Sequence, residues 1–141
     1  MARAFTLAMS QDELSEFFRQ AFPGDPGRNF TFERFDPGFL RIRLVPDDTM
    51  LRPGNLVSGP TQMALADRAA YAVILAHIGP VAMAVTSNLN MSFLRGVAME
   101  PVLADATLLK LGRRLATVDV RLWQGQAAHV VAQSTVTYAI P

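Results

Sequence analysis

The sequence predicts an α+β fold in which a curved antiparallel sheet of about six strands wraps one long central helix. Three observations support this prediction. The segment over residues 61–78 is apolar around its whole circumference, which is typical of a buried helix. Two alternating apolar and polar runs precede it, and further alternating runs follow it. One sheet covers only part of such a helix, so a second copy of the chain is expected to cover the remainder.

A short helix is predicted near the N-terminus. Ser10, with Glu13 three residues later, forms a capping-box pattern before the segment Gln11–Phe22. Its apolar residues lie on one side, which is typical of a helix packed on a core. The helix is expected to end before Pro23, and residues Asp25–Asn29 are expected to form a loop.

A β-hairpin is predicted next. The runs Phe30–Asp36 and Phe39–Val45 alternate between apolar and polar residues and flank the pair Pro37-Gly38, which is a turn signal. The segment Pro46–Gly59 contains several prolines and glycines, so it is expected to be irregular. It leads directly into the central helix.

The central helix has clear start and stop signals. Pro60 suits its first position, because the N–H that proline lacks would be unbonded there, and Gly79 suits the position after its end. Asp67 is an acidic residue near the middle of this apolar segment. A carboxylate there is costly unless it is paired or used in chemistry, so Asp67 is a candidate functional residue.

The remainder of the chain is predicted to be four strands in a meander. Apolar and polar residues alternate through each of them, and Gln124-Gly125-Gln126 is expected to form the last hairpin turn. In the first strand, Thr86 falls on the polar parity. The predicted strands are Val81–Phe93, Val102–Leu111, Leu115–Trp123 and Ala127–Ile140.

Composition limits the classes of function. The 141 residues are expected to form a single domain, with a helix and loop over 1–29 and a core over 30–141. The net charge of +1 gives no support for nucleic-acid or membrane-surface binding. Cysteine is absent, which excludes disulfides and thiolate chemistry and fits a cytoplasmic protein. The first residues form too short an apolar run for a signal sequence, and charged residues interrupt the 61–78 segment, so no membrane span is expected.

Three ordered sequence blocks resemble one known family. Ser58-Gly59 is followed eight residues later by Asp67, the block 88–95 reads Asn-Leu-Asn-Met-Ser-Phe-Leu-Arg, and 111–115 reads Leu-Gly-Arg-Arg-Leu. This set, spread from about Leu51 to Tyr138, resembles the phenylacetate-pathway (PaaI-like) branch of the acyl-CoA thioesterases. The resemblance implies a hotdog fold, with active sites between two protomers.

The resemblance also implies roles for individual residues. Asp67 takes the place of the helix acid that acts as general base or as nucleophile on the thioester. The backbone N–H of Gly59, at the start of a helix whose dipole favours negative charge, is suited to stabilise an oxyanion. A hydroxyl ahead of the Asn-Leu-Asn block assists in the family. Thr86 aligns with it, and its neighbour Ser87 is the alternative.

The sequence departs from the family pattern ahead of the helix. The family often has His-Gly-Gly, whereas here Ser58 replaces the imidazole and Pro60 removes a second N–H donor. At the loop position where the family usually has Asn or Gln, this sequence has Arg52. Asn55 could take the place of that residue only if the loop shifted. Ser58, Arg52 and Asn55 are therefore the substrate-binding candidates in this segment, and Ser87 is a further one.

Structural interpretations compete with functional ones. Asp67 could be a buried acid paired with an arginine, and Ser58 could simply cap the helix. His77 lies near the helix C-terminus, where an imidazole suits the dipole, and His129 is expected at a solvated or interfacial strand position.

A basic cluster is predicted at one strand turn. Lys110, Arg113 and Arg114 could bind the phosphates of coenzyme A, as basic residues do in the resembling family, or form a solvated hairpin tip.

The sequence as a whole favours an acyl-CoA thioesterase that acts as a homodimer or homotetramer on a small-molecule acyl-CoA. Coenzyme A enters only as part of the substrate, and no other cofactor and no metal is expected, because the two histidines are far apart in the sequence. A non-catalytic acyl-CoA-binding protein and an acyl-ACP thioesterase remain as alternatives. No nucleophile elbow or dinucleotide motif is present. The acyl group is not specified.

Overall fold

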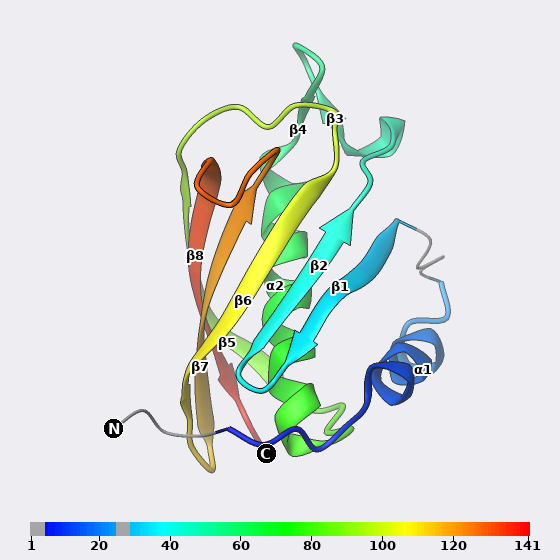
Figure 1. Cartoon of the computed structure of the whole chain (residues 1–141), viewed down its shortest axis with the longest axis vertical. Helices are drawn as coiled ribbons and strands as arrows, with labels where there is room; N and C mark the ends of the chain where they lie inside the picture. The colour runs from blue at the N-terminus through cyan, green and yellow to red at the C-terminus, as the bar shows by residue number, and fades with distance from the viewer. Residues whose placement is uncertain (1–4, 25–28) are drawn as a thin grey trace.

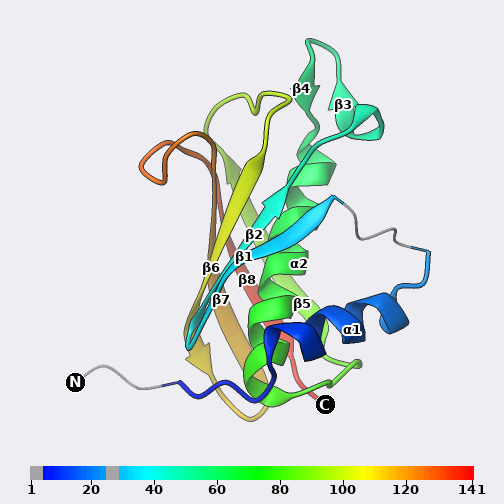
Figure 2. The ribbon, with the colours of Figure 1, turned by 45° about the vertical axis from the view of Figure 1, so that its right-hand side comes forward.

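The computed structural model describes residues 5–24 and 29–141 and shows a twisted six-stranded antiparallel sheet packed along one long helix, α2 (Gly59–Ile78). The strand order is β1-β2-β6-β7-β8-β5. The helix α2 lies between this sheet and the short helix α1 (Gln11–Ala21) (Figures 1 and 2). The strands of the sheet are β1 (Phe30–Asp36), β2 (Phe39–Leu44), β5 (Val85–Phe93), β6 (Val102–Leu111), β7 (Leu115–Trp123) and β8 (Val130–Ala139). This arrangement is the predicted hotdog fold.

The N-terminal predictions are confirmed where the structure describes them. Ser10 caps α1, and both hydrogen bonds of the capping box with Glu13 are formed. Strands β1 and β2 pair as the expected hairpin, with Asp36 opposite Phe39. Most of the predicted loop 25–29 lies outside the described residues, as do residues 1–4.

The long helix is also confirmed, with its start one residue earlier than the predicted first position at Pro60. The Ser58 side chain accepts a hydrogen bond from the Thr61 N–H as N-cap, so Gly59 is the first helical residue and Pro60 the second. The helix ends at Ile78, and the residue after it, Gly79, is the C-cap with a φ of 93°, in the left-handed region that glycine tolerates. Of the described helices, none is long and apolar enough to cross a membrane.

Three strand predictions are wrong in part. Strand β5 pairs with β8 at the sheet edge and not with β6, so only β6, β7 and β8 form a meander. Residues 81–84 and 127–129 are not strand. The segment predicted to be irregular contains a 3-10 turn, η1 (Asp48–Met50), and a small hairpin of β3 (Leu51–Arg52) and β4 (Leu56–Val57) at the start of α2 (Figure 1).

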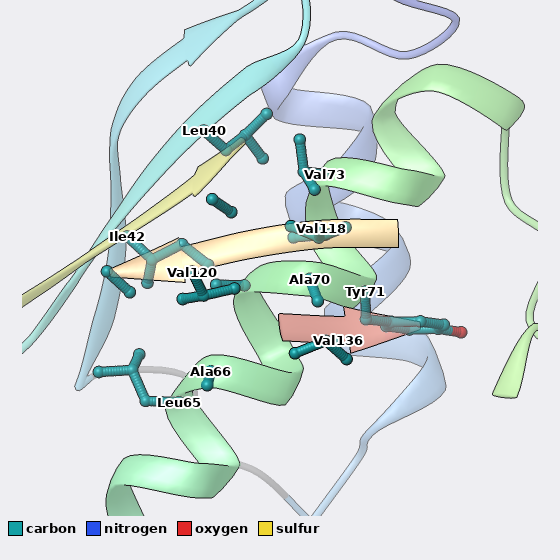
Figure 3. Packing of buried hydrophobic residues seen from close by; sticks show 14 of the residues in the cluster. Leu40, Ile42, Leu65, Ala66, Ala70, Tyr71, Val73, Val118, Val120 and Val136 are labelled. Atoms are coloured by element: carbon teal, nitrogen blue, oxygen red, sulfur yellow. The ribbon is translucent and has the colours of Figure 1, made fainter. Parts of the chain in front are cut away.

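The core lies between α2 and the inner face of the sheet. Residues of α2 such as Ala66, Ala70 and Val73 meet inward-facing residues of several strands, among them Val118 and Val136 (Figure 3). Small alanines let the strands approach the helix closely, and the branched side chains fill the remaining space. The helix is thereby fixed against the sheet along most of its length.

His77 has a different role from the one predicted. Its Nε2 accepts a hydrogen bond of 2.8 Å from the Gly38 N–H in the β1–β2 turn, and its Nδ1 lies 2.7 Å from the Val73 carbonyl oxygen. The ring is buried, and this burial lowers the pKa of His77. A neutral imidazole therefore links the end of α2 to the first hairpin, in place of a charge acting on the helix dipole.

Candidate active site

The site is centred on the half-buried carboxylate of Asp67 in α2. Two hydroxyl groups donate hydrogen bonds to the same oxygen, Oδ1: Thr86 Oγ1 at 2.7 Å and Tyr138 Oη at 2.8 Å. Among the described residues, none donates to Oδ2. None of the arginines that the structure describes forms an ion pair with Asp67, so those residues do not show the alternative of a structural ion pair. Both described side-chain hydrogen bonds therefore hold the carboxylate through the same oxygen, Oδ1.

Thr86 reaches Asp67 because β5 contains a bulge. Thr86 pairs with Tyr138 and Asn88 with Thr137, which leaves Ser87 as an extra residue. Side chains normally alternate between the two faces of a strand, and the bulge reverses this alternation. Thr86 and Leu89 therefore lie on the same inner face, although one has an even and the other an odd residue number. Of the two predicted hydroxyls, the structure brings that of Thr86 to Asp67, although both Thr86 and Ser87 are exposed.

Tyr138 is a site residue that the sequence reasoning missed. Its ring is 3% exposed and stacks on Tyr71 with centroids 5.6 Å apart, and burial raises the pKa of its hydroxyl. The hydroxyl therefore stays protonated and acts as a donor. One signal was available, because Tyr138 carries a hydroxyl on the mainly apolar parity of the last strand, which it shares with Ser134, and a buried hydroxyl there needs a partner.

A cavity of about 460 Å³ opens beside this carboxylate. Asp67, Thr86 and Tyr138 line it together with residues of α1, α2 and the segment before β5. Its aromatic lining comprises Phe18, Phe22, Phe30 and Tyr71 in addition to Tyr138. The Asp67 carboxylate thus adjoins a mainly apolar space, which is the usual composition of a small-molecule site.

Arg68 follows Asp67 and lines the same cavity. Its guanidinium lies over the ring of Phe30 at 4.2 Å from the centroid, and within 6 Å of the rings of Phe18 and Phe22. Burial among these rings lowers the pKa of Arg68. The arrangement is a set of cation–π contacts that ties α1 and β1 to α2.

The other predicted residues gather at the start of α2. Ser58 caps the helix, and the Gly59 N–H has no acceptor among the described residues. Arg52 and Asn55 are exposed on the small β3–β4 hairpin beside them. Gly59 precedes Asp67 by eight helical residues, which is about 12 Å along the helix axis. Within one chain, therefore, this group does not meet the Asp67 carboxylate.

The basic turn lies at the Asp67 end of the sheet. Ala116 is opposite Tyr138, which is in turn opposite Thr86, so these three residues form one row across β7, β8 and β5. Arg114 is two residues from that row, and its carbonyl oxygen accepts a hydrogen bond from the Ile140 N–H. Both Arg113 and Arg114 are exposed, as is Lys110. His129 is exposed just before β8.

The sequence profile of the thioesterase superfamily matches residues 54–131, which is more than half of the chain. The chain therefore belongs to the thioesterase superfamily. The matched region contains the start of α2, Asp67 and Thr86, whereas Tyr138 and α1 lie outside it.

Solved structures agree with this assignment. A candidate thioesterase from Silicibacter sp. TM1040 is 42% identical, with a TM-score of 0.87 over 97% of this chain and 95% of that one. A phenylacetic acid degradation-related protein from Ralstonia eutropha JMP134 is 27% identical, with a TM-score of 0.74 over 88% and 98%. A Streptococcus mutans UA159 protein bound to acetyl-CoA is 24% identical, with a TM-score of 0.70 over 80% and 89%, and shares the fold. The resemblance to PaaI-type thioesterases is confirmed.

Proposed function

We propose that the protein hydrolyses acyl-CoA thioesters with Asp67 as the reacting carboxylate. The observation that carries this proposal is the asymmetric hydrogen bonding of Asp67. Thr86 and Tyr138 both hold Oδ1, while Oδ2 has no donor among the described residues and the side chain lines the cavity. A carboxylate fixed in this way is suited to act on a bound electrophile.

Asp67 can act in either of two ways. As a general base, its carboxylate takes a proton from a water molecule while the water oxygen attacks the thioester carbon. As a nucleophile, it attacks that carbon itself, and water then hydrolyses the resulting anhydride. In both routes negative charge develops on the carbonyl oxygen, the C–S bond breaks, and coenzyme A leaves as a thiolate that takes up a proton. No metal participates in either route.

The developing oxyanion needs a hydrogen-bond donor, and we assign this role to the Gly59 N–H. The Gly59 N–H has no acceptor among the residues that the structure describes and lies at the positive end of a helix dipole, but it is about 12 Å from Asp67 along α2. A second copy with α2 antiparallel would place its Gly59 beside Asp67 of the first. The active sites would then lie between two protomers, each with residues from both.

The exposed surface of α2 is consistent with such a pairing. Pro60, Met63 and Ala64 are exposed and lie on one side of the helix between Gly59 and Asp67. A two-fold axis that exchanges Gly59 and Asp67 passes near Met63, which is 41% exposed. A homodimer is therefore the smallest unit in which the proposed site is complete.

A coenzyme A ester suits the surroundings of this site. Arg113 and Arg114 are exposed at the end of the sheet that carries Thr86 and Tyr138, and arginine is well suited to bind phosphates. The structural neighbour from Streptococcus mutans holds acetyl-CoA, so the shared fold accommodates this kind of ligand. We expect the two arginines to bind coenzyme A phosphates.

The first test is thiol release from a panel of acyl-CoAs by the wild type and by Asp67→Asn. General-base catalysis contributes about 10²–10⁴-fold, so turnover should fall by at least that factor in the variant while its melting temperature is kept. Asp36→Asn removes a surface carboxylate outside the site and serves as control. Full activity in Asp67→Asn would refute the mechanism. No turnover with any ester, but a raised melting temperature, would instead indicate the binding protein.

The second test addresses the shared site. Gly59→Pro removes the N–H at a helix position that proline tolerates, while Gly59→Ala keeps it, and a Cβ there would meet the Phe93 ring at an ordinary 3.6 Å. We expect loss of activity only in Gly59→Pro. Mixing Gly59→Pro with Asp67→Asn should restore activity, because one site of each mixed dimer has both groups intact. Mixtures that remain inactive after verified subunit exchange would refute the arrangement between protomers.

A further inference from the structure

The far wall of the cavity is built by α1, which lies outside the sheet and helix that define the fold. Phe18 and Phe22 of this segment line the cavity together with Asp67. Two ring contacts lead from the carboxylate to α1: Tyr138 to Tyr71 at 5.6 Å, and Tyr71 to Phe18 at 5.8 Å. The lining is thus continuous from the proposed reacting group to the N-terminal helix.

The position of this wall depends on a few aromatic contacts. Phe18 contacts Tyr71, and Phe22 stacks on Phe18 at 5.8 Å. Phe22 is the C-cap of α1 and is 41% exposed, so it lies at the edge of the cavity and not in the core. A ring at this position limits how far a ligand that starts at Asp67 can extend.

We infer that this cavity binds the acyl group of the substrate and that Phe18 and Phe22 close its far end. The inference rests on the proposed function, and it identifies α1 as the element that determines acyl length. An uncharged, apolar acyl group is the ligand that this lining fits, because the cavity is aromatic beyond the carboxylate and the guanidinium of Arg68 is already covered by rings. The part of an acyl chain that extends past Phe22 gains no further apolar contact in the cavity.

Binding of S-alkyl-CoA thioethers of graded chain length tests this inference without depending on hydrolysis. Calorimetric affinities would be measured for the wild type, Phe22→Ala and Phe22→Trp. Phe17→Ala is the matched control, because Phe17 lies on the same helix and contacts Phe18 and Tyr71, yet it does not line the cavity. This control reports any effect of loosening α1 alone.

The wild type should gain affinity with chain length up to a limit. Phe22→Ala should raise that chain-length limit by about two to four carbons. Each methylene newly accommodated should tighten binding roughly fourfold. Phe22→Trp should shorten the limit, and Phe17→Ala should leave it in place. An unchanged limit in both Phe22 variants, or an equal shift in Phe17→Ala, would overturn the inference.

The two proposals fail in different ways. A protein that binds the thioethers with a limit set by Phe22 but hydrolyses no acyl-CoA would contradict the proposed function and support the acyl site. A protein that hydrolyses acyl-CoAs through Asp67, with a length profile that no Phe22 variant changes, would support the function and overturn the acyl site.

Discussion

The two halves of α2 differ in what surrounds them. From Ala69 to His77 every residue is buried, and the last of them is hydrogen-bonded to the first hairpin. In the first half, Met63 and Ala64 are exposed and Asp67 is half-buried. One helix therefore combines an anchored half, which fixes its position, with an open half, which presents the candidate site. The contrast indicates that stability and activity should respond to different substitutions along the same helix.

The largest expected effect is a loss of stability from a substitution in the anchored half of α2. Leu75 is fully buried, so Leu75→Ala should lower the free energy of unfolding by about 2–5 kcal/mol through lost burial and an added cavity. Turnover per folded molecule should be nearly unchanged. Urea denaturation and active-site-normalised kinetics would measure both. If kcat fell while the unfolding free energy stayed the same, the proposed division of the helix would be wrong.

A smaller effect is expected at the contact that orients the carboxylate. Tyr138→Phe keeps the ring stacked on Tyr71 and removes only the donor to Asp67. Hydrogen bonds to charged groups contribute about 1.5–3 kcal/mol, so kcat should fall roughly tenfold or more with little change in KM. Thr86→Ser keeps the second hydroxyl and should stay active, whereas Thr86→Val should resemble Tyr138→Phe. Wild-type kcat in Tyr138→Phe would show that one donor is sufficient.

A pH dependence is expected from the buried imidazole. Burial lowers the pKa of His77 below its ordinary value of 6.5, so the unfolded chain binds a proton that the folded chain does not as the pH falls below that value. Stability should therefore decrease from about pH 6.5 downward. His77→Gln keeps an acceptor and a donor but does not titrate. On acidification the wild type should lose stability that the variant keeps, so the difference in unfolding free energy between them should narrow or reverse. A difference that stays constant with pH would contradict this expectation.

The smallest effect is expected at the open end of the helix. Ser58 accepts a hydrogen bond from the Thr61 N–H, so Ser58→Ala should cost about 1 kcal/mol of stability. If the hydroxyl only caps the helix, kcat/KM should change little at a temperature well below the melting point. A loss of kcat/KM that exceeds the loss of folded protein would instead assign Ser58 to substrate binding.

Periodicity predicted most of the elements but not their neighbours in the sheet. The long helix, the first hairpin and the strands β6 and β7 lie within a residue or two of the expected bounds. The pairing of β5 with β8 was missed because alternation indicates a strand and a face, and not the partner strand. The β3–β4 hairpin was missed because two-residue strands have no measurable period.

The site could be predicted only where a motif carried it. Asp67, Gly59 and Thr86 follow from spacing and resemblance as predicted site residues, and the structure places the Thr86 hydroxyl 2.7 Å from Asp67 Oδ1. Tyr138 lies 71 residues from Asp67, and only the pairing of β5 with β8 brings it close. The aromatic wall of α1 was interpreted as an ordinary apolar helix face, since nothing in its sequence shows that it faces a cavity.

The single extra residue at Ser87 makes the candidate site sensitive to the number of residues in β5 as well as to their type. Side chains alternate along a strand, so one inserted residue exchanges the two faces on one side of it. A deletion of Ser87 would keep Asp67, Thr86 and Tyr138 in the sequence, yet regular alternation would turn Thr86 away from α2 or shift the pairing with β8. Among related chains, a one-residue gap at this position would therefore mark an altered site that a comparison of residue identities alone overlooks.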